Sequence, residues 1–131
     1  MKKELIIPEE SRAGYDAYHF APAMKVGNTI WVSGLTGSGP GGEVGTLEQQ
    51  LHIVFKKLEN VLKSAGATLD DVVELLSFHV DIHIDAQTVF AVKDQYFKKD
   101  YPAWTAVGVV ALAQPGLLVE FRAQAVIGCG S

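Results

Sequence analysis

Residues 101–112 read Tyr-Pro-Ala-Trp-Thr-Ala-Val-Gly-Val-Val-Ala-Leu, and the other elements of the chain are placed relative to this stretch. Pro102 cannot lie inside a helix, and it favours an extended conformation at Tyr101. The residues that follow are small or β-branched and carry no charge, which predicts a buried strand over residues 104–112. A side chain at the entry of a strand can project from a rigid scaffold towards a ligand. Trp104 is therefore a candidate ligand contact.

The rest of the chain divides into short strands and two helices. A Thr-Leu-Glu-Gln sequence at residues 46–49 forms a capping box, and apolar residues recur at three- and four-residue steps from there to Gly66. The Gly27-Asn28 connection indicates a hairpin, because such turns need a positive φ. Asp85 can cap a second helix. We expect helices over residues 46–66 and 86–98, a loop over residues 9–18, and strands over residues 4–8, 21–26, 29–33, 72–82, 104–112 and 117–127.

This order of elements predicts an α+β fold in which two helices cover one face of a mixed sheet. Two helices rarely cover both faces of a six-stranded sheet, so the second face is expected to stay uncovered. We assign Ser77, His79, Val107 and Val109 to that uncovered face. Because an exposed apolar face favours association, the pattern predicts a homo-oligomer.

Composition excludes several classes of protein. The chain has 131 residues, a net charge of −4 and one cysteine, Cys129, so no intramolecular disulfide can form. Its length fits a single domain over residues 1–131. No segment approaches the ~20 apolar residues that span a bilayer, and the scattered Lys and Arg residues offer no basic stripe for nucleic acid. The opening residues lack a signal-peptide core. We expect a cytoplasmic protein with no membrane or nucleic-acid partner.

Two features that suggest cofactor or metal chemistry have simpler explanations. Residues 34–45 contain six glycines and Pro40, but they lack the Gly-Lys-Ser/Thr ending of a phosphate loop, so a flexible connection is favoured. Ser77, His79 and Asp81 alternate along one strand and are expected to lie too far apart for a catalytic relay. His79 and His83 are four residues apart on that strand, too far to chelate a metal. No cofactor is expected.

Beyond these local patterns, a set of motifs resembles the Rid family (YjgF-type, reactive intermediate deaminases) over nearly the whole chain. The order is Val-Gly-Asn, Val-Ser-Gly, a glycine-rich loop, a helix ending in Ser-Ala-Gly, Pro-Ala-x-x-x-Val-Gly-Val and Val-Glu-Phe-Arg-Ala-Gln-Ala. No single motif is decisive, but their order and spacing together are specific. The resemblance implies a chorismate-mutase-like fold with a six-stranded sheet, and a homotrimer with small-molecule clefts between its subunits.

The resemblance also assigns expected roles to individual residues. Glu120 matches the family glutamate that positions a hydrolytic water, and Ser33 and Gly34 match the Ser-Gly whose backbone lines the pocket floor. Trp104 stands where the archetypal deaminases have an arginine that holds the substrate carboxylate. Phe20 replaces a tyrosine of the family.

Leu35 replaces a family glutamine, which makes the expected pocket drier and less cationic. Strand alternation places Leu118, Glu120, Arg122 and Gln124 on one side. Arg122 is therefore either the ion-pair partner of Glu120, a substitute carboxylate anchor, or simply exposed.

Three functions remain open from the sequence. The first is hydrolysis of enamine or imine intermediates, that is deamination, through a water held by Glu120. The second is non-catalytic binding of a small molecule on the same trimer, or regulation by one. The third is the endoribonuclease or translation-inhibitor activity attributed to some relatives, which the acidic net charge disfavours.

Overall fold

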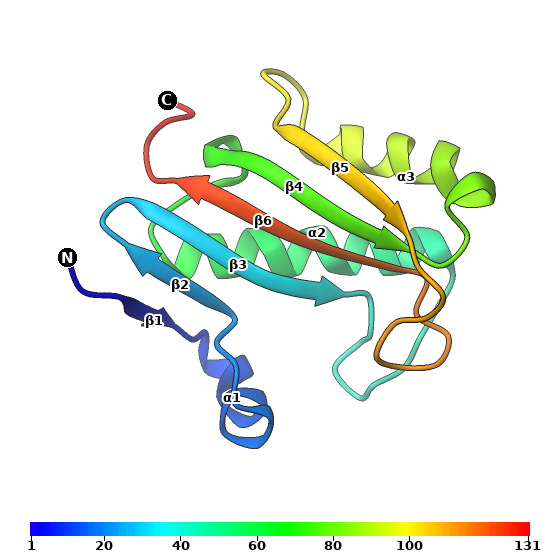
Figure 1. Ribbon diagram of the computed structural model, residues 1–131, viewed down its shortest axis with the longest axis horizontal. Coiled ribbons are helices and arrows are strands. Elements are labelled where there is room, and N and C mark those ends of the chain that lie inside the picture. Colours follow the sequence, from blue (N-terminus) through cyan, green and yellow to red (C-terminus); the bar gives the residue numbers. More distant parts are fainter.

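A computed structural model describes all 131 residues. The chain forms six strands and three α-helices, in the order β1-α1-β2-β3-α2-β4-α3-β5-β6 (Figure 1). The strands are β1 (Glu4–Ile6), β2 (Ala23–Val26), β3 (Thr29–Thr36), β4 (Val72–His79), β5 (Ala103–Gly108) and β6 (Val119–Val126). The helices are α1 (Arg12–Tyr18), α2 (Leu47–Ser64) and α3 (Ile82–Tyr96), with 3-10 turns at Glu9–Ser11 and Leu69–Asp71.

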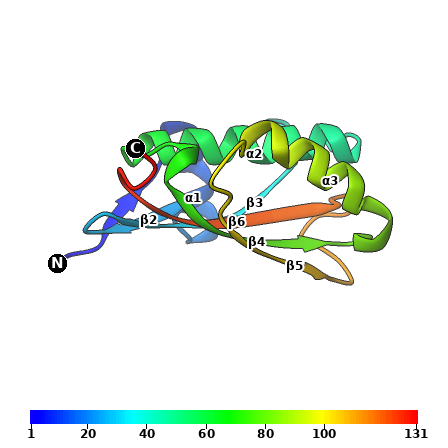
Figure 2. The same ribbon diagram turned by 90° about the horizontal axis from the view of Figure 1, so that it is seen from above.

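All six strands form one mixed sheet in the order β1-β2-β3-β6-β4-β5. β4 and β5 run parallel and are joined through α3, whereas every other pair is antiparallel. Helices α2 and α3 cover the same face of this sheet (Figure 2). The predicted α+β class, with a six-stranded mixed sheet and two long helices on one face, is confirmed.

The capping box and the hairpin form as the sequence predicts. The Thr46 hydroxyl accepts from the Gln49 amide at 3.3 Å, and the Gln49 side chain accepts from the Thr46 amide at 2.9 Å. These bonds satisfy two amides that the start of a helix leaves free. Gly27 has a φ of 58° in the turn between β2 and β3. The apolar face of α2 is buried against the sheet, through Leu51, Val54, Phe55, Leu58, Val61 and Leu62.

Several predicted limits of elements are wrong, and the two largest differences concern helices. Residues 9–18 form a 3-10 turn and helix α1 rather than a loop, although α1 buries no residue and has no side-chain cap. Without a buried stripe, such a short helix leaves little periodicity in the sequence. The strand predicted over residues 72–82 ends at His79, and α3 begins at Ile82 after Asp81 rather than after Asp85. The apolar residues Ile82 and Ile84 continued the strand-like alternation and hid the helix start.

The strand predicted over residues 104–112 does form, but its limits and its position in the sheet differ from the prediction. β5 ends at Gly108, and it lies at the edge of the sheet rather than in the buried centre. Val107 is 40% exposed, and Val110 beyond the strand is 98% exposed. A run of β-branched residues specifies an extended backbone, but the same run suits an edge strand that another surface can cover.

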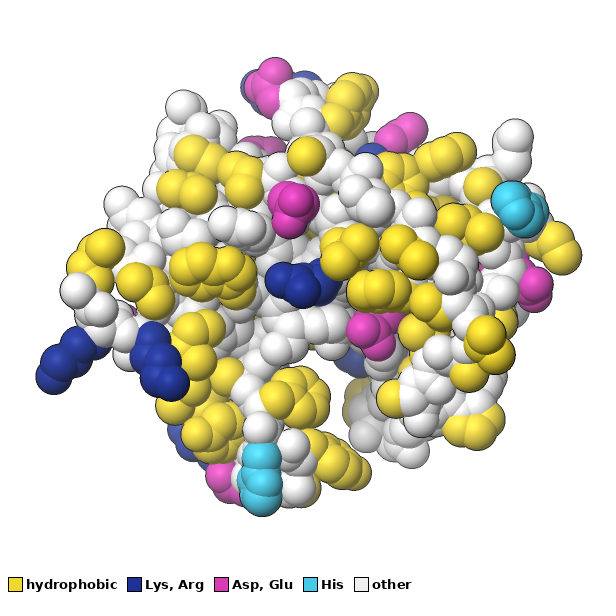
Figure 3. All heavy atoms as spheres, in the orientation of Figure 1, with side chains coloured by type: hydrophobic (Ala, Val, Ile, Leu, Met, Phe, Trp, Pro, Cys, Tyr) yellow, Lys and Arg dark blue, Asp and Glu magenta, His cyan; other side chains and the backbone are white.

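The uncovered face also differs in part from the prediction. Ser77 and His79 are buried under the helices, with His79 only 1% exposed, whereas Val107 does lie on the open face in register with Phe78. Hydrophobic side chains occupy much of this open face, with a few charged groups among them (Figure 3). None of the three helices combines the length and the apolar character required to cross a membrane.

Candidate functional site

The two principal candidates, Glu120 and Trp104, point to opposite faces of the sheet. Glu120 is in register with Phe78, which pairs in turn with Val107 on the open face. Trp104 is in register with Leu75, a fully buried core residue under the helices. Register partners share a face of a sheet. Within one chain, therefore, the carboxylate and the indole do not line the same cavity.

Glu120 lies half-buried on the open face, beside the backbone of Gly34. A Cβ at position 34 would collide with the Glu120 carboxylate, so this close approach requires glycine. Burial raises the pKa of the Glu120 carboxyl above its usual value, because removal from water disfavours the charged form. The carboxylate makes no salt bridge with Arg122; the single ion pair in the structure joins Lys93 and Asp94. Of the alternatives left open for Arg122, the ion pair with Glu120 is therefore not formed.

The other predicted residues divide between the two faces. Arg122 is exposed on the open face, in register with Leu76. Leu35 instead packs against the core and pairs with the buried Phe121. The Ser33 hydroxyl donates to the Ala21 carbonyl at 2.7 Å, which ties β3 to the segment before β2.

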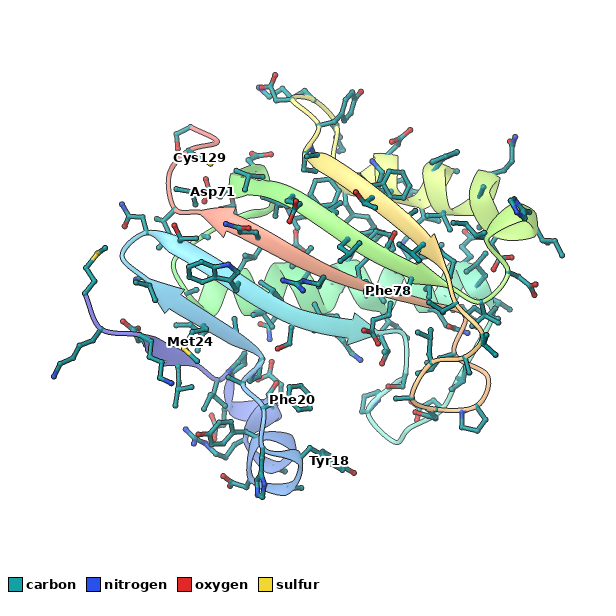
Figure 4. All side chains as sticks on the ribbon, viewed as in Figure 1. Tyr18, Phe20, Met24, Asp71, Phe78 and Cys129 are labelled. Atoms are coloured by element: carbon teal, nitrogen blue, oxygen red, sulfur yellow. The ribbon has the colours of Figure 1, made fainter.

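Phe20 lies beside α1 and is 55% exposed. Figure 4 shows it near Tyr18, while Phe78 lies on β4, which β3 and β6 separate from β2. Glu120, Gly34 and Arg122 are therefore the predicted residues that share the open face around the carboxylate.

Trp104 belongs to a hydrogen-bonded chain of three side chains under α3. Its Nε1–H donates to the Ser77 hydroxyl at 2.8 Å, and the same hydroxyl lies 2.7 Å from Nε2 of His79. Ser77, His79 and Asp81 were expected to lie too far apart for a catalytic relay, and this spacing argument is wrong for the pair Ser77 and His79. Residues i and i+2 of a strand share a face, and their side chains can lean towards each other along it. Asp81 takes no part, because the strand has ended before it.

Aromatic contacts fix the indole of Trp104 in this position. Its ring stacks on Phe121 at 6.3 Å between centroids and meets the edge of Phe90 at 5.4 Å. The ammonium of Lys93, a residue only 6% exposed, lies 4.9 Å from the centroid of the indole ring. A cation held over an aromatic face is stabilised by the negative potential of the ring.

A cavity of about 260 Å³ opens beside Trp104, between α3 and β5. Most of its wall is apolar, and its lining consists of His79, Ile82, His83, Ala86, Val89, Phe90, Trp104 and Ala106. Nδ1 of His79 is buried and has no hydrogen-bond partner. Sequence patterns place Ser77 and His79 on one strand, but no sequence signal relates either of them to Trp104. That neighbourhood depends on the parallel register of β4 and β5.

The stability of the fold should depend on the burial of His79. Burial lowers the pKa of its imidazole, so the folded protein keeps it neutral while the unfolded chain takes up a proton below about pH 6.5. We expect the free energy of unfolding to fall as the pH decreases through that value. Urea denaturation at pH 7.5 and pH 5 should show this decline, and His79→Phe should show a smaller one. An equal decline in both proteins would exclude His79 as its source.

Comparison with known proteins identifies the family. The family model described as endoribonuclease L-PSP matches residues 11–127. The chain belongs to the Rid (YjgF/L-PSP) family. The RutC family protein YjgH of Escherichia coli K12 is 34% identical over 118 residues, which cover 86% of this chain and 88% of that protein. A human 2-iminobutanoate/2-iminopropanoate deaminase is 33% identical over 112 residues, covering 83% and 80% of the two chains.

Solved structures of Rid-family proteins have the same fold. A structure of the protein YjgH has a TM-score of 0.87 and 32% identity, and the match covers 97% of this chain and 98% of that one. The structure of a family member from Mycobacterium tuberculosis has a TM-score of 0.83 and 32% identity. The match covers 96% of this chain and 100% of that one. The resemblance of the sequence motifs to the Rid family is thereby confirmed.

Proposed function

We propose that this Rid-family chain forms a homotrimer and hydrolyses a small enamine or imine at Glu120, in a cleft between subunits. In such a reaction, an enamine first tautomerises to its imine by moving a proton from nitrogen to carbon. Water then adds to the C=N carbon, and the C–N bond breaks to release ammonia and a carbonyl compound. Glu120 would hold the water, accept its proton and return a proton to the leaving nitrogen. The deaminase names of the human and rodent relatives support this reaction class.

The environment of Glu120 is the observation that carries the proposal. A carboxyl that accepts and returns a proton works best when its pKa lies close to the working pH. Half-burial without a cationic partner raises the pKa of Glu120 in that direction. The carboxylate packs directly against the backbone of Gly34, with no side chain between them.

Glu120→Gln is the direct test of the proposed chemistry. The amide keeps the size of the side chain but cannot accept a proton, so we expect at least a 100-fold loss of imine hydrolysis, the lower range for a general acid–base group. Glu74, an exposed glutamate on β4, provides the matched control Glu74→Gln, which should retain activity. Ammonia release from freshly generated imines would be followed. Equal turnover by Glu120→Gln and the unmodified protein would exclude the mechanism.

The same site should handle 2-imino acids poorly. Trp104 offers no cation to a carboxylate, and its indole is held under α3 rather than on the Glu120 face. A bidentate arginine contact is among the strongest anchors for a carboxylate. We expect turnover of 2-iminopropanoate well below that of arginine-bearing deaminases measured alongside. Comparable turnover would indicate another anchor, and Arg122→Ala would then test the one guanidinium on that face.

The trimer is expected because the open face of the sheet is left without cover. Leu5, Trp31 and Val107 are 46%, 39% and 40% exposed on or beside this face, and apolar area of this kind commonly marks an interface. Light scattering at micromolar concentration should report about three chains. A stable monomer would remove the proposed cleft between subunits, because the faces that form it would remain apart.

Non-catalytic binding of a small molecule is the second candidate function. The specific observation in its favour is the apolar cavity beside Trp104, which lies on the opposite face from Glu120. Binding there without hydrolysis of any imine would support this function over deamination. A role in RNA cleavage is disfavoured by the net charge of −4, since polyanion binding relies on clustered cations.

A further inference from the structure

A cavity on the helical side of the molecule, away from the open face, is lined by two lysines. Its volume is about 620 Å³, and it lies between α2, the 3-10 turn at Glu9–Ser11 and the loop that joins β3 to α2. Its lining consists of Glu10, Ser38, Gly39, Pro40, His52, Ile53, Lys56, Lys57 and Asn60. Because α2 covers the face opposite to the open one (Figure 2), association of chains through the open face would leave this cavity accessible.

Lys57 is the half-buried lysine of this cavity, and no acid neutralises it. Its Nζ donates to the Thr36 carbonyl at 2.8 Å, a bond that a neutral amine can also make. The single ion pair of the structure involves other residues, and Glu10, the one acid that lines the cavity, accepts from the Asn60 side chain. Burial lowers the pKa of Lys57, because removal from water disfavours the ammonium. Lys57 can therefore lose its proton more readily than an exposed lysine.

A neutral lysine amine that faces a cavity is a nucleophile for carbonyl compounds. We propose that Lys57 forms a reversible imine with an aldehyde that carries an anionic group. The amine nitrogen bonds to the carbonyl carbon, both protons of the amine leave with the carbonyl oxygen as one molecule of water, and a C=N bond remains. This site is separate from Glu120 and does not depend on the proposed hydrolysis.

The other groups of the cavity select the kind of aldehyde. Lys56 supplies a cation beside the neutral Lys57, and its ammonium lies 5.8 Å from the centroid of the Tyr96 ring without an acid partner. An anionic substituent of the aldehyde would be attracted to this ammonium. Pro40, Ile53 and the methylene stems of the two lysines provide apolar surface. Since the cavity is larger than the ~150 Å³ that accommodates benzene in an engineered protein, an aromatic body fits.

Two aldehydes of similar shape test both parts of the proposal. The compound 4-carboxybenzaldehyde is anionic, whereas 4-formylbenzamide is neutral. Sodium cyanoborohydride reduces each imine to a stable secondary amine, which peptide mapping by mass spectrometry locates. At neutral pH we expect Lys57 to be labelled at least about fivefold faster than the exposed Lys63, because the neutral fraction of an amine sets its rate. The carboxylate should label Lys57 about threefold faster than the amide, the effect of one exposed ion pair, once both rates are divided by those with Nα-acetyllysine.

Variants then assign each effect to one side chain. Lys57→Arg keeps a cation and a donor for the Thr36 carbonyl but cannot form an imine, so the label in that peptide should disappear. Lys56→Gln should remove the preference for the carboxylate, whereas the matched control Lys63→Gln should keep it. Glu120→Gln should keep the labelling of Lys57, whatever its effect on hydrolysis, so the two proposals can fail separately.

The unmodified protein alone can overturn the proposal if a variant does not fold. Labelling of Lys57 no faster than that of Lys63 would refute it. Equal corrected rates for the two aldehydes would overturn it as well, because the anionic group would then play no part. An unchanged initial rate of total labelling in Lys57→Arg would have the same effect, since other amines would then account for the reaction.

Discussion

Trp104→Arg should lower the free energy of unfolding by about 2 to 3 kcal/mol, below the ~3 to 5 kcal/mol for loss of a fully buried large side chain, because Trp104 is only partly buried. The substitution removes the ring that packs on Phe90 and Phe121, and it removes the donor to Ser77. It also places a second cation beside the Lys93 ammonium, which lies 4.9 Å from the indole centroid. Urea denaturation followed by circular dichroism would measure the change.

Trp104→Phe separates the contributions at this position. Phenylalanine keeps an aromatic ring against Phe121 and adds no charge, so its cost should be about 1 to 2 kcal/mol, from lost area and the lost hydrogen bond. If Trp104→Arg were instead as stable as the unmodified protein, position 104 would accept a cation without rearrangement. In that case one substitution would restore the family arginine. We expect that it does not, because the Lys93 ammonium and the Phe90 ring lie against the side chain at position 104.

Gln50→Ala should cost about 3 kcal/mol, because one fully buried side chain makes three hydrogen bonds to the backbone of two separate loops. Its Nε2 donates to the carbonyls of Gly45 and Gly116, at 3.0 Å and 3.2 Å, and its Oε1 accepts from the Leu118 amide at 2.8 Å. Alanine would leave these groups without partners inside the protein. Since a buried backbone amide without a partner is costly, the loops before α2 and β6 should both loosen.

The exposed Gln95 on α3 supplies the control Gln95→Ala, for which we expect a change within about 0.5 kcal/mol. Hydrogen exchange of the Leu118 amide should accelerate in Gln50→Ala and remain unchanged in Gln95→Ala. Equal stability of the two variants would show that water replaces the Gln50 contacts without cost, and that the two loops are held by other interactions.

Several elements follow from the sequence alone because their causes are local. The capping box at Thr46 and Gln49 and the positive φ of Gly27 each involve residues within a few positions of one another. Successive side chains of β6 point to alternate faces of the sheet, whatever strand pairs with it. This alternation correctly placed Glu120 and Arg122 on one side of the sheet. Local hydrogen bonding and a two-residue period specify such features before any tertiary contact forms.

Other features depend on register, which the sequence does not display. The pairing of β4 with β6 shifts between Val72 and Glu74, and a shift of one residue moves side chains to the other face. The edge position of β5 was missed because edge strands and central strands share β-branched residues. For the same reason the sequence did not show that Trp104 faces the helices while Glu120 faces away.

Local patterns were enough to predict the family, the α+β class, helix α2, the β2–β3 hairpin and the face shared by Glu120 and Arg122. The side-chain neighbourhoods on which function depends arise only when the strands pair. Tertiary structure alone joins Trp104, Ser77 and His79, because Trp104 reaches Ser77 across 27 positions of the chain, through the parallel pairing of β4 and β5. It also sets the burial that raises the pKa of Glu120 and lowers that of His79. The sequence shows which groups can titrate. How strongly each one is removed from water, and so how its pKa shifts, depends on the whole fold.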